Sequence, residues 1–376
     1  MDLLVCGGAG YIGGFLSKML VEQGHKVVVF DNLRVGLREN TLHPRIEFVE
    51  GNLLNERELC RLFHNHHFMG VFHMATISPY TIDSQNIHHS HENNITGTLN
   101  LLSQMHIANV NNIVFASSGL VYGTPTRGKL GVTVPTAPET PFATTNVTIE
   151  GMLTDFYEAN GLSSVSLRFN NASGIAEHYH HYQWHDANPP ELVKLLKAFL
   201  PNDAPAFEVP DHNDSEDDSS PVRDYVHVLD VCDAFIKAML YLQQGEQGAQ
   251  KFNLGSNGGI SYKSLLEIAK RVSGTQSGNT HIVAASEEHS PKVQTLSSLR
   301  AKRLLGWEPK YSPEDILQSL WQYMIQPRID PVIDDFNKAL GQTTKDSYTV
   351  ASNERLIDKI EILGDTMVSE EIAKSQ

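Results

Sequence analysis

The segment from Leu3 to Asp31 constrains the fold of this chain more than any other part of its sequence. An apolar run, LLVC at 3–6, is followed at once by the glycine-rich loop GGAGYIG at 7–13 and by a stretch with helical apolar periodicity. A second apolar run, KVVVF at 26–30, closes on Asp31. Short apolar runs are typical of strands buried on both faces. The segment therefore predicts a strand, a glycine-rich turn, a helix and a second strand.

Glycines at 7, 10 and 13 have a physical purpose in such a unit. They allow a tight turn, a close approach of the backbone to a pyrophosphate, and close packing of the helix on the sheet. A carboxylate at the end of the second strand is placed to accept hydrogen bonds from adenosine ribose hydroxyls, and it would repel the 2′-phosphate of NADP. We therefore predict that Gly7, Gly10, Gly13 and Asp31 bind NAD.

Strand and helix patterns continue to alternate beyond this unit. A helix begins near Asn94 and carries apolar residues at helical spacing, namely Leu99, Leu101, Leu102 and Met105. Further apolar runs predict strands at 46–49, 71–75, 112–118 and 164–169. The alternation predicts an α/β fold with a Rossmann-type, doubly wound parallel sheet and a smaller C-terminal substrate-side α/β region.

We divide the chain into three parts on this basis. Residues 1–170 form an NAD-binding domain whose sheet also takes in parts of 220–260, and residues 171–324 form the substrate-side region. Residues 325–376 form a C-terminal extension with two apolar helical stripes. Two interpretations of the extension stay open: it packs against its own domain, or it docks to a partner.

The composition excludes several classes of function. The chain has 376 residues and a formal net charge of −15, which argues against an extended surface for nucleic acid or anionic membranes. No apolar stretch approaches the roughly 20 residues that span a bilayer, and no signal peptide is recognisable. Three scattered cysteines, Cys6, Cys60 and Cys232, suit a reducing compartment. We therefore predict a cytoplasmic protein without nucleic-acid or membrane partners.

Several motifs occur in a fixed order between Met1 and about Met324. They are GGAGYIG (7–13), DNL (31–33), NNITGTLNLL (93–102), ASSGLVYG (116–123), RFNNASG (168–174), VRDYVHVLDV (222–231) and FNLG (252–255). In this respect the chain resembles the extended short-chain dehydrogenase/reductase family of NAD-dependent epimerases and dehydratases, and most closely its UDP-glucose 4-epimerases. The resemblance implies NAD as the cofactor and a nucleotide sugar as the ligand.

The resemblance also implies which residues contact the cofactor. Asn52 stands where the family has an aspartate that reaches the adenine amino group, and its side chain still offers a carbonyl acceptor. The implied cofactor contacts are Gly7, Gly10, Tyr11, Ile12, Gly13, Asp31, Asn32, Asn52, Leu53 and Ala75.

In this family a serine, a tyrosine and a lysine four residues later do the chemistry. Ser118 matches the serine, whereas Phe142 stands where the tyrosine is expected and Asn146 where the lysine is expected. No Tyr-x-x-x-Lys sequence occurs anywhere in the chain, so a shifted alignment does not restore the pair. Phenylalanine has no proton to exchange and asparagine has no charge. The resemblance therefore implies a degenerate catalytic site.

The ligand side of the resemblance is partly preserved. Ser118 and Asn171 match ligand-binding positions, and Arg223 matches a diphosphate-binding arginine, although an ion pair with Asp224 or Asp230 is the alternative role for Arg223. A second expected arginine is replaced within SEEH at 286–289, where the glutamates would repel a diphosphate.

Two functions are compatible with these features. The first is an NAD-binding, epimerase-like protein with lost or altered catalysis and a regulatory or scaffolding role, as a homodimer or in a hetero-complex. The alternative is an active NAD-dependent epimerase, dehydratase or reductase with a non-standard acid/base, although Gly119 and Leu120 disfavour a common 4,6-dehydratase. The candidates for that acid/base are Thr144, Thr145, Tyr80 and Tyr122.

Three further segments complete the sequence-based hypotheses. The histidine-rich stretch 177–186 has no metal-site spacing, so we interpret it as an aromatic lid and predict no metal. The acidic run 211–218 lacks the glycine of an EF-hand loop and is interpreted as a solvated loop. The helix after Asn146 carries an apolar face that we expect to take part in subunit pairing, made of Ile149, Met152, Leu153 and Phe156.

Overall fold

A computed structural model describes most of the chain before residue 326. The described residues are 1–78, 86–124, 128–176, 190–201, 204–211, 220–256, 258–284 and 293–325. The tyrosine candidate at position 80, the histidine-rich stretch, nearly all of the acidic run, the SEEH segment and the extension beyond Ile325 lie outside these residues.

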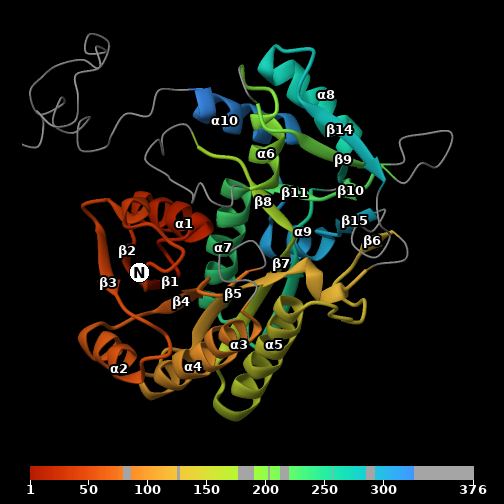
Figure 1. Cartoon of the computed structure of the whole chain (residues 1–376). Coiled ribbons are helices and arrows are strands. Elements are labelled where there is room, and N and C mark those ends of the chain that lie inside the picture. Colours follow the sequence, from red (N-terminus) through yellow and green to blue (C-terminus); the bar gives the residue numbers. More distant parts are fainter. Residues whose placement is uncertain are drawn as a thin grey trace, which may run out of the picture. The chain divides into compact units, whose positions relative to one another are not determined.

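A parallel sheet of seven strands forms the centre of the described fold (Figure 1). Its strand order is β12-β7-β5-β4-β1-β2-β3, so the chain winds outward from β1 in both directions. The strands are β1 (Asp2–Cys6), β2 (Lys26–Asp31), β3 (Ile46–Glu50), β4 (Gly70–His73), β5 (Asn112–Ser118), β7 (Ser163–Phe169) and β12 (Ala249–Asn253). The prediction of a doubly wound Rossmann-type sheet is confirmed.

Successive side chains of each strand point to opposite faces of the sheet, and both faces are buried, which explains why the apolar runs are nearly continuous. Leu3 and Val5 of β1 enter one apolar cluster, whereas Leu4 and Cys6 enter the cluster on the opposite face. Because parallel strands of this kind have both faces covered, nearly every position in them is apolar. The sequence pattern of the strands therefore reflects two cores, one on each face of the sheet.

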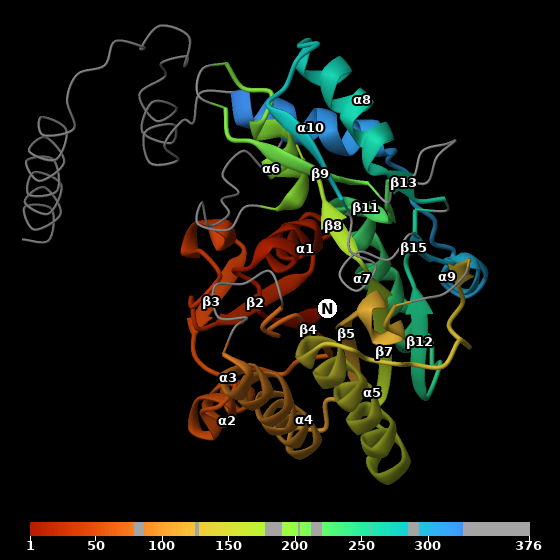
Figure 2. The same ribbon diagram turned by 45° about the vertical axis from the view of Figure 1, so that its right-hand side comes forward.

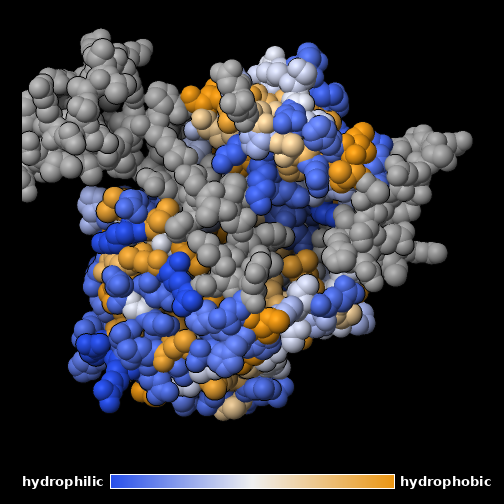
Figure 3. Space-filling model, viewed as in Figure 1, coloured by the Kyte–Doolittle hydropathy of each residue, from blue (hydrophilic) through white to orange (hydrophobic). Residues whose placement is uncertain are grey.

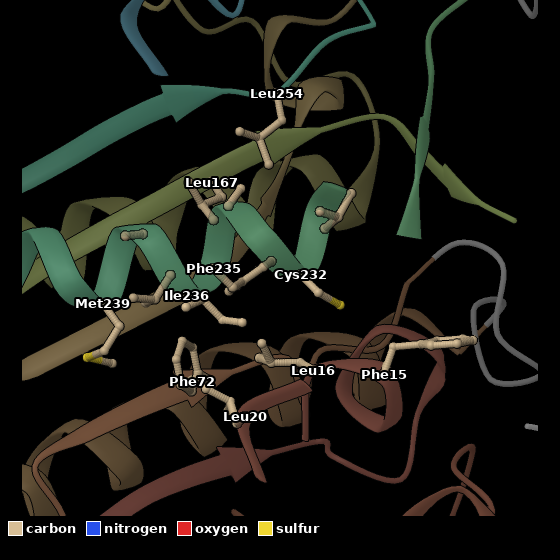
Figure 4. Close-up of a cluster of buried hydrophobic side chains, with 14 of the residues drawn as sticks. Phe15, Leu16, Leu20, Phe72, Leu167, Cys232, Phe235, Ile236, Met239 and Leu254 are labelled. Atoms are coloured by element: carbon tan, nitrogen blue, oxygen red, sulfur yellow. The ribbon is translucent and has the colours of Figure 1, made fainter. Parts of the chain in front are cut away.

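Helices cover both faces of the sheet (Figures 1 and 2). One face packs against α1 (Tyr11–Glu22) and α7 (Val228–Gln243), and Figure 4 shows Leu16 and Leu20 of α1 directed toward Phe72 and Phe235. The other face packs against α2 (Glu56–Asn65), α4 (Gly97–Ile107) and α5 (Pro141–Asn160). This three-layer arrangement leaves the carboxyl edge of the sheet for binding loops.

Outside the central sheet the described fold has small sheets and a separate apolar cluster, which is formed mainly by α6 (Glu191–Lys197), α8 (Tyr262–Ser273) and α10 (Pro313–Ile325). The strands of the small sheets are β6 (Lys129–Leu130), β8 (Asn171–Ser173), β9 (Phe207–Asp211), β10 (Val222–Arg223), β11 (Tyr225–His227), β13 (Ile260–Ser261), β14 (Thr280–Ala284) and β15 (Val293–Leu296). They pair in the orders β13-β10-β15-β6, β11-β8 and β14-β9. The remaining α-helices are α3 (Ile87–His91) and α9 (Leu299–Leu305).

Two details of the predicted helices differ in the structure. The helix expected to begin near Asn94 starts earlier, because α3 (Ile87–His91) continues through a π-helical turn at Glu92–Thr96 into α4. Leu99 of α4 is 45% exposed. The apolar face expected to take part in subunit pairing is largely used within the chain, because Ile149 and Leu153 are buried in the core under α5. Sequence periodicity identifies an apolar face but does not show what covers it.

The surface of the described fold is mixed in character. On the face shown in Figure 3, hydrophilic residues predominate over α2 and α4, and apolar residues form small separate patches. None of the helices within the described ranges is long and apolar enough to cross a membrane. All three cysteines are free, with Cys6 and Cys232 buried and Cys60 exposed.

Candidate functional site

The glycine-rich loop joins β1 to α1 at the carboxyl edge of the sheet. Gly7 has φ +80°, a conformation that L side chains rarely adopt, and a Cβ atom there would lie 2.7 Å from the backbone nitrogen of Ala75. A Cβ atom on Gly13 would collide with the carbonyl oxygen of Gly7, and one on Gly10 would lie 3.3 Å from that oxygen. The glycines therefore let the first turn of α1 approach the loop and leave the helix N-terminus open to an anion.

Asp31, at the end of β2, holds this loop in place. Its Oδ2 accepts a hydrogen bond from the backbone N–H of Ala9 (3.0 Å), and its Oδ1 accepts one from that of Leu33 (2.8 Å). Burial raises the pKa of the Asp31 carboxyl above its usual range, and the backbone hydrogen bonds act in the opposite direction. Each carboxylate oxygen keeps a further acceptor site, so Asp31 fits the role of a ribose-hydroxyl acceptor. Asn32, beside it, is exposed.

The other cofactor candidates lie at the same edge or brace it. The Oδ1 of Asn52 accepts a hydrogen bond from the N–H of Leu54 (3.0 Å). Leu53 is buried, and its carbonyl accepts from Asn100 Nδ2 (3.0 Å). Gly7 lies directly against Ala75, which follows β4.

Two candidates at the start of α1 contact the later part of the chain. The Tyr11 hydroxyl donates to the carbonyl oxygen of Gly174, and Cys232 Sγ donates to that of Ile12 (3.7 Å). These contacts connect the glycine-rich loop with the segment after β8 and with α7. The loop is therefore fixed from both halves of the described fold.

Ser118 ends β5 and precedes the short 3-10 turn Gly119–Tyr122. Its Oγ accepts a hydrogen bond from the N–H of Leu120 (3.1 Å), and the residue is only 6% exposed. The hydroxyl proton can still be donated, so Ser118 is positioned as a hydrogen-bond donor at the carboxyl edge.

Phe142 and Asn146 lie one turn apart near the N-terminus of α5. Thr140 caps this helix by accepting from the N–H of Ala143 (3.2 Å), and Pro141 occupies its first turn. Asn146 Nδ2 donates to the carbonyl oxygen of Phe142 (2.8 Å) on its own helix. Asn146 is fully buried, and its Oδ1 has no partner among the described residues. The Asn146 side chain thus donates a hydrogen bond to the backbone of its own helix and, unlike a lysine side chain, carries no positive charge.

Three of the candidate acid/base groups are engaged in hydrogen bonds. The buried Thr145 hydroxyl donates to Phe142 O (2.8 Å) and accepts from Asn94 Nδ2 (3.1 Å). The exposed Thr144 hydroxyl donates to Thr140 O (3.1 Å). The Tyr122 hydroxyl donates to Asn253 Oδ1 (2.8 Å), so none of the three presents a free acid or base.

A buried polar network below Ser118 was not predicted from the sequence. Glu150 of α5 accepts from Arg168 Nε (2.8 Å), Arg168 Nη2 (2.5 Å) and Ser117 Oγ (2.7 Å). Arg168 Nη1 donates to the Tyr122 hydroxyl (2.8 Å), which connects the network to Asn253. The sequence signal that could have indicated this network is the arginine within the apolar strand SVSLRF, since a buried charge requires a partner.

The ligand-side candidates Asn171 and Arg223 lie on β8 and β10, two short strands outside the seven-stranded sheet. Asn171 Nδ2 donates to Asp224 O (3.3 Å), and the guanidinium of Arg223 lies 5.8 Å from the ring centre of Tyr262. The carboxylate of Asp224 accepts from the N–H groups of Ser256 (2.6 Å) and Leu296 (2.7 Å). Backbone groups thus hold this carboxylate in place. In the part of the chain that the structure describes, no group of three or more His, Cys, Asp or Glu side chains could hold a metal.

Comparison with known proteins identifies the relatives of this chain. Residues 3–255 match the NAD dependent epimerase/dehydratase family. The UDP-glucose 4-epimerase of Halalkalibacterium halodurans is 33% identical over 324 residues, which cover 86% of this chain and 95% of that protein. The enzyme of the same name from Lacticaseibacillus casei is 31% identical over 330 residues, with coverage of 86% and 96%.

Solved structures show the same relationship. The UDP-glucose 4-epimerase of Brucella ovis in complex with NAD superposes with a TM-score of 0.79 at 28% identity, covering 86% of this chain and 98% of that one. The Thermotoga maritima enzyme with UDP-glucose gives 0.72 at 28% identity, with the same coverage. The prediction of NAD as the cofactor is confirmed at the level of the family. The chain belongs to the NAD dependent epimerase/dehydratase family.

Proposed function

We propose that this chain binds NAD and a nucleotide sugar but does not carry out the hydride-shuttle epimerisation of its relatives, and that it acts as a regulatory or scaffolding subunit. The observation that carries the proposal is the start of α5, where Phe142 and Asn146 occupy the positions at which the family resemblance places tyrosine and lysine. In this proposal the subunit forms a homodimer or a hetero-complex.

The loss of these two groups removes the proton chemistry. A phenyl ring cannot take the proton of a sugar hydroxyl, and a neutral amide cannot lower the pKa of a neighbouring base. A positioned acid or base alone contributes on the order of 10²–10⁴ in rate. The hydrogen bonds of Thr144, Thr145 and Tyr122 support the proposal further, because these groups are committed to the fold.

The residues of the glycine-rich loop fit NAD. Gly7, Gly10 and Gly13 let the loop and the first turn of α1 pack closely, as a pyrophosphate-binding turn requires. Asp31 retains acceptor sites for the ribose hydroxyls. NAD, when bound, supplies a hydride acceptor. Ser118 would donate a hydrogen bond to a ligand oxygen, and Asn171 and Arg223 would bind the nucleotide part.

We expect excess NAD to raise the thermal unfolding temperature of the wild type while a coupled assay detects no conversion of UDP-glucose to UDP-galactose. A ligand at about 100 times its dissociation constant adds roughly 2.7 kcal/mol of stability. Asp31→Ala should lose most of the shift, whereas Asp155→Ala, an exposed carboxylate on α5, should retain it. An equal shift in Asp31→Ala, or no shift in the wild type, would contradict the assignment of the NAD site.

A further inference from the structure

The amide of Asn170, directly after β7, is a buried polar group that the proposed function does not use. Both Oδ1 and Nδ2 are buried, and neither has a hydrogen-bond partner among the described residues. The observation does not depend on which atom is the nitrogen, since neither atom has a partner in the part of the chain that the structure describes. Buried amides are almost always paired, because an unpaired donor or acceptor destabilises the folded state.

The Asn170 amide lies at the carboxyl edge of the central sheet, close to Ser118. In the register of β5 with β7, Ser118 lies opposite Phe169, the residue before Asn170. A Cβ atom on Gly119 would collide with Asn170 Oδ1, so the amide lies against the residue that follows Ser118. Ligands of doubly wound folds bind at the carboxyl ends of the strands. The absence of a side chain at Gly119 therefore leaves room for an amide next to Ser118.

The neighbouring polar side chains differ from Asn170 in their pairing. Arg168, two residues earlier, is bound by Glu150 and Tyr122. Asn171, the next residue, donates through Nδ2 to Asp224 O. The Asn170 amide thus keeps a donor and an acceptor that no other described residue uses.

We propose that the Asn170 amide binds the sugar part of a nucleotide sugar, with Nδ2 donating to one hydroxyl and Oδ1 accepting from an adjacent one. The chemistry matches, since an amide offers a donor and an acceptor side by side and vicinal hydroxyls offer both. The assignment rests on the proposed binding of a nucleotide sugar, and it adds a residue that determines recognition of the sugar.

The first test is the stability of the ligand-free protein with Asn170→Leu, a side chain of similar shape without polar atoms. A binding group without a partner in the ligand-free protein destabilises the folded state. Its removal in Asn170→Leu should therefore raise the unfolding temperature by about 2 °C or more above that of the wild type. Asn160→Leu at the exposed end of α5 is the matched control, and its unfolding temperature should not rise. A lower unfolding temperature for Asn170→Leu would identify the amide as a structural group and overturn the proposal.

The second test titrates the NAD-loaded protein with UDP-glucose and, separately, with UDP. Asn170→Leu and Asn170→Ala should bind UDP-glucose about tenfold more weakly than the wild type. Their affinity for UDP, which lacks the sugar, should stay within about twofold. Unchanged affinity for UDP-glucose, or an equal loss for both ligands, would overturn the role of Asn170 alone. A wild type that binds neither ligand would contradict the proposed function and, with it, this assignment.

Discussion

The double variant Phe142→Tyr, Asn146→Lys is expected to convert UDP-glucose to UDP-galactose at least about 100-fold faster than the wild type. Restored tyrosine supplies the proton acceptor, and restored lysine supplies the charge that lowers its pKa. Either single change should stay near the wild-type level. A tyrosine without the charge keeps a pKa of about 10 and is almost fully protonated at neutral pH. A lysine without the tyrosine has nothing to activate.

A matched control for this variant uses the same helix. Phe142→Tyr, Thr148→Lys also adds one tyrosine and one lysine, but residue 148 lies on the exposed face of α5. It should remain inactive, because the charge must lie near the tyrosine. Activity in this control equal to that of the double variant would show that the position of the lysine is irrelevant. No activity in any variant would contradict the claim that the pocket is otherwise preserved.

Replacing Glu150 with Gln is expected to cause a large loss of stability. The change leaves the guanidinium of Arg168, which is 2% exposed, without its charged partner. Breaking such a buried pair costs about 3–5 kcal/mol, which lowers the unfolding temperature by roughly 6 °C or more. Thermal and urea unfolding measure the effect, and Glu158→Gln at the exposed end of α5 is the control.

A double variant separates the effect of an unpaired buried charge on stability from the effect of side-chain packing. Removing both members, in Glu150→Leu, Arg168→Leu, should cost less than Glu150→Gln, because no buried charge is left unpaired. Two results would contradict this account of the network: a Glu150→Gln shift as small as that of Glu158→Gln, or a double variant less stable than the single one.

The central sheet and the glycine-rich loop could be predicted because their signals are local. A strand buried on both faces requires a nearly continuous apolar run, as in β1, and the turn into α1 requires glycine at positions where a side chain would collide. Asp31 follows from its place at the end of β2. The family could be predicted for the same reason, since its motifs are short stretches of sequence in a fixed order along the chain.

The parts that could not be predicted depend on residues far apart in the sequence. Arg168 and Glu150 pair across β7 and α5, and Tyr122 reaches Asn253 across 131 positions. No pattern in the sequence shows that the Thr145 hydroxyl accepts a hydrogen bond from Asn94, which lies 51 positions earlier. Similarly, helical periodicity predicted an apolar helix face with Ile149 and Leu153, but only the packing shows that this face is buried against the sheet of the same chain.

The most direct test of the central claim observes hydride transfer itself. Wild-type protein loaded with NAD is mixed with UDP-glucose in a single turnover, and NADH fluorescence is followed while calorimetry on the same sample reports binding of the sugar nucleotide. The account predicts binding without any rise in NADH fluorescence, because no group at positions 142 and 146 can take the proton that must leave with the hydride. A rise in NADH fluorescence in the wild type would contradict it.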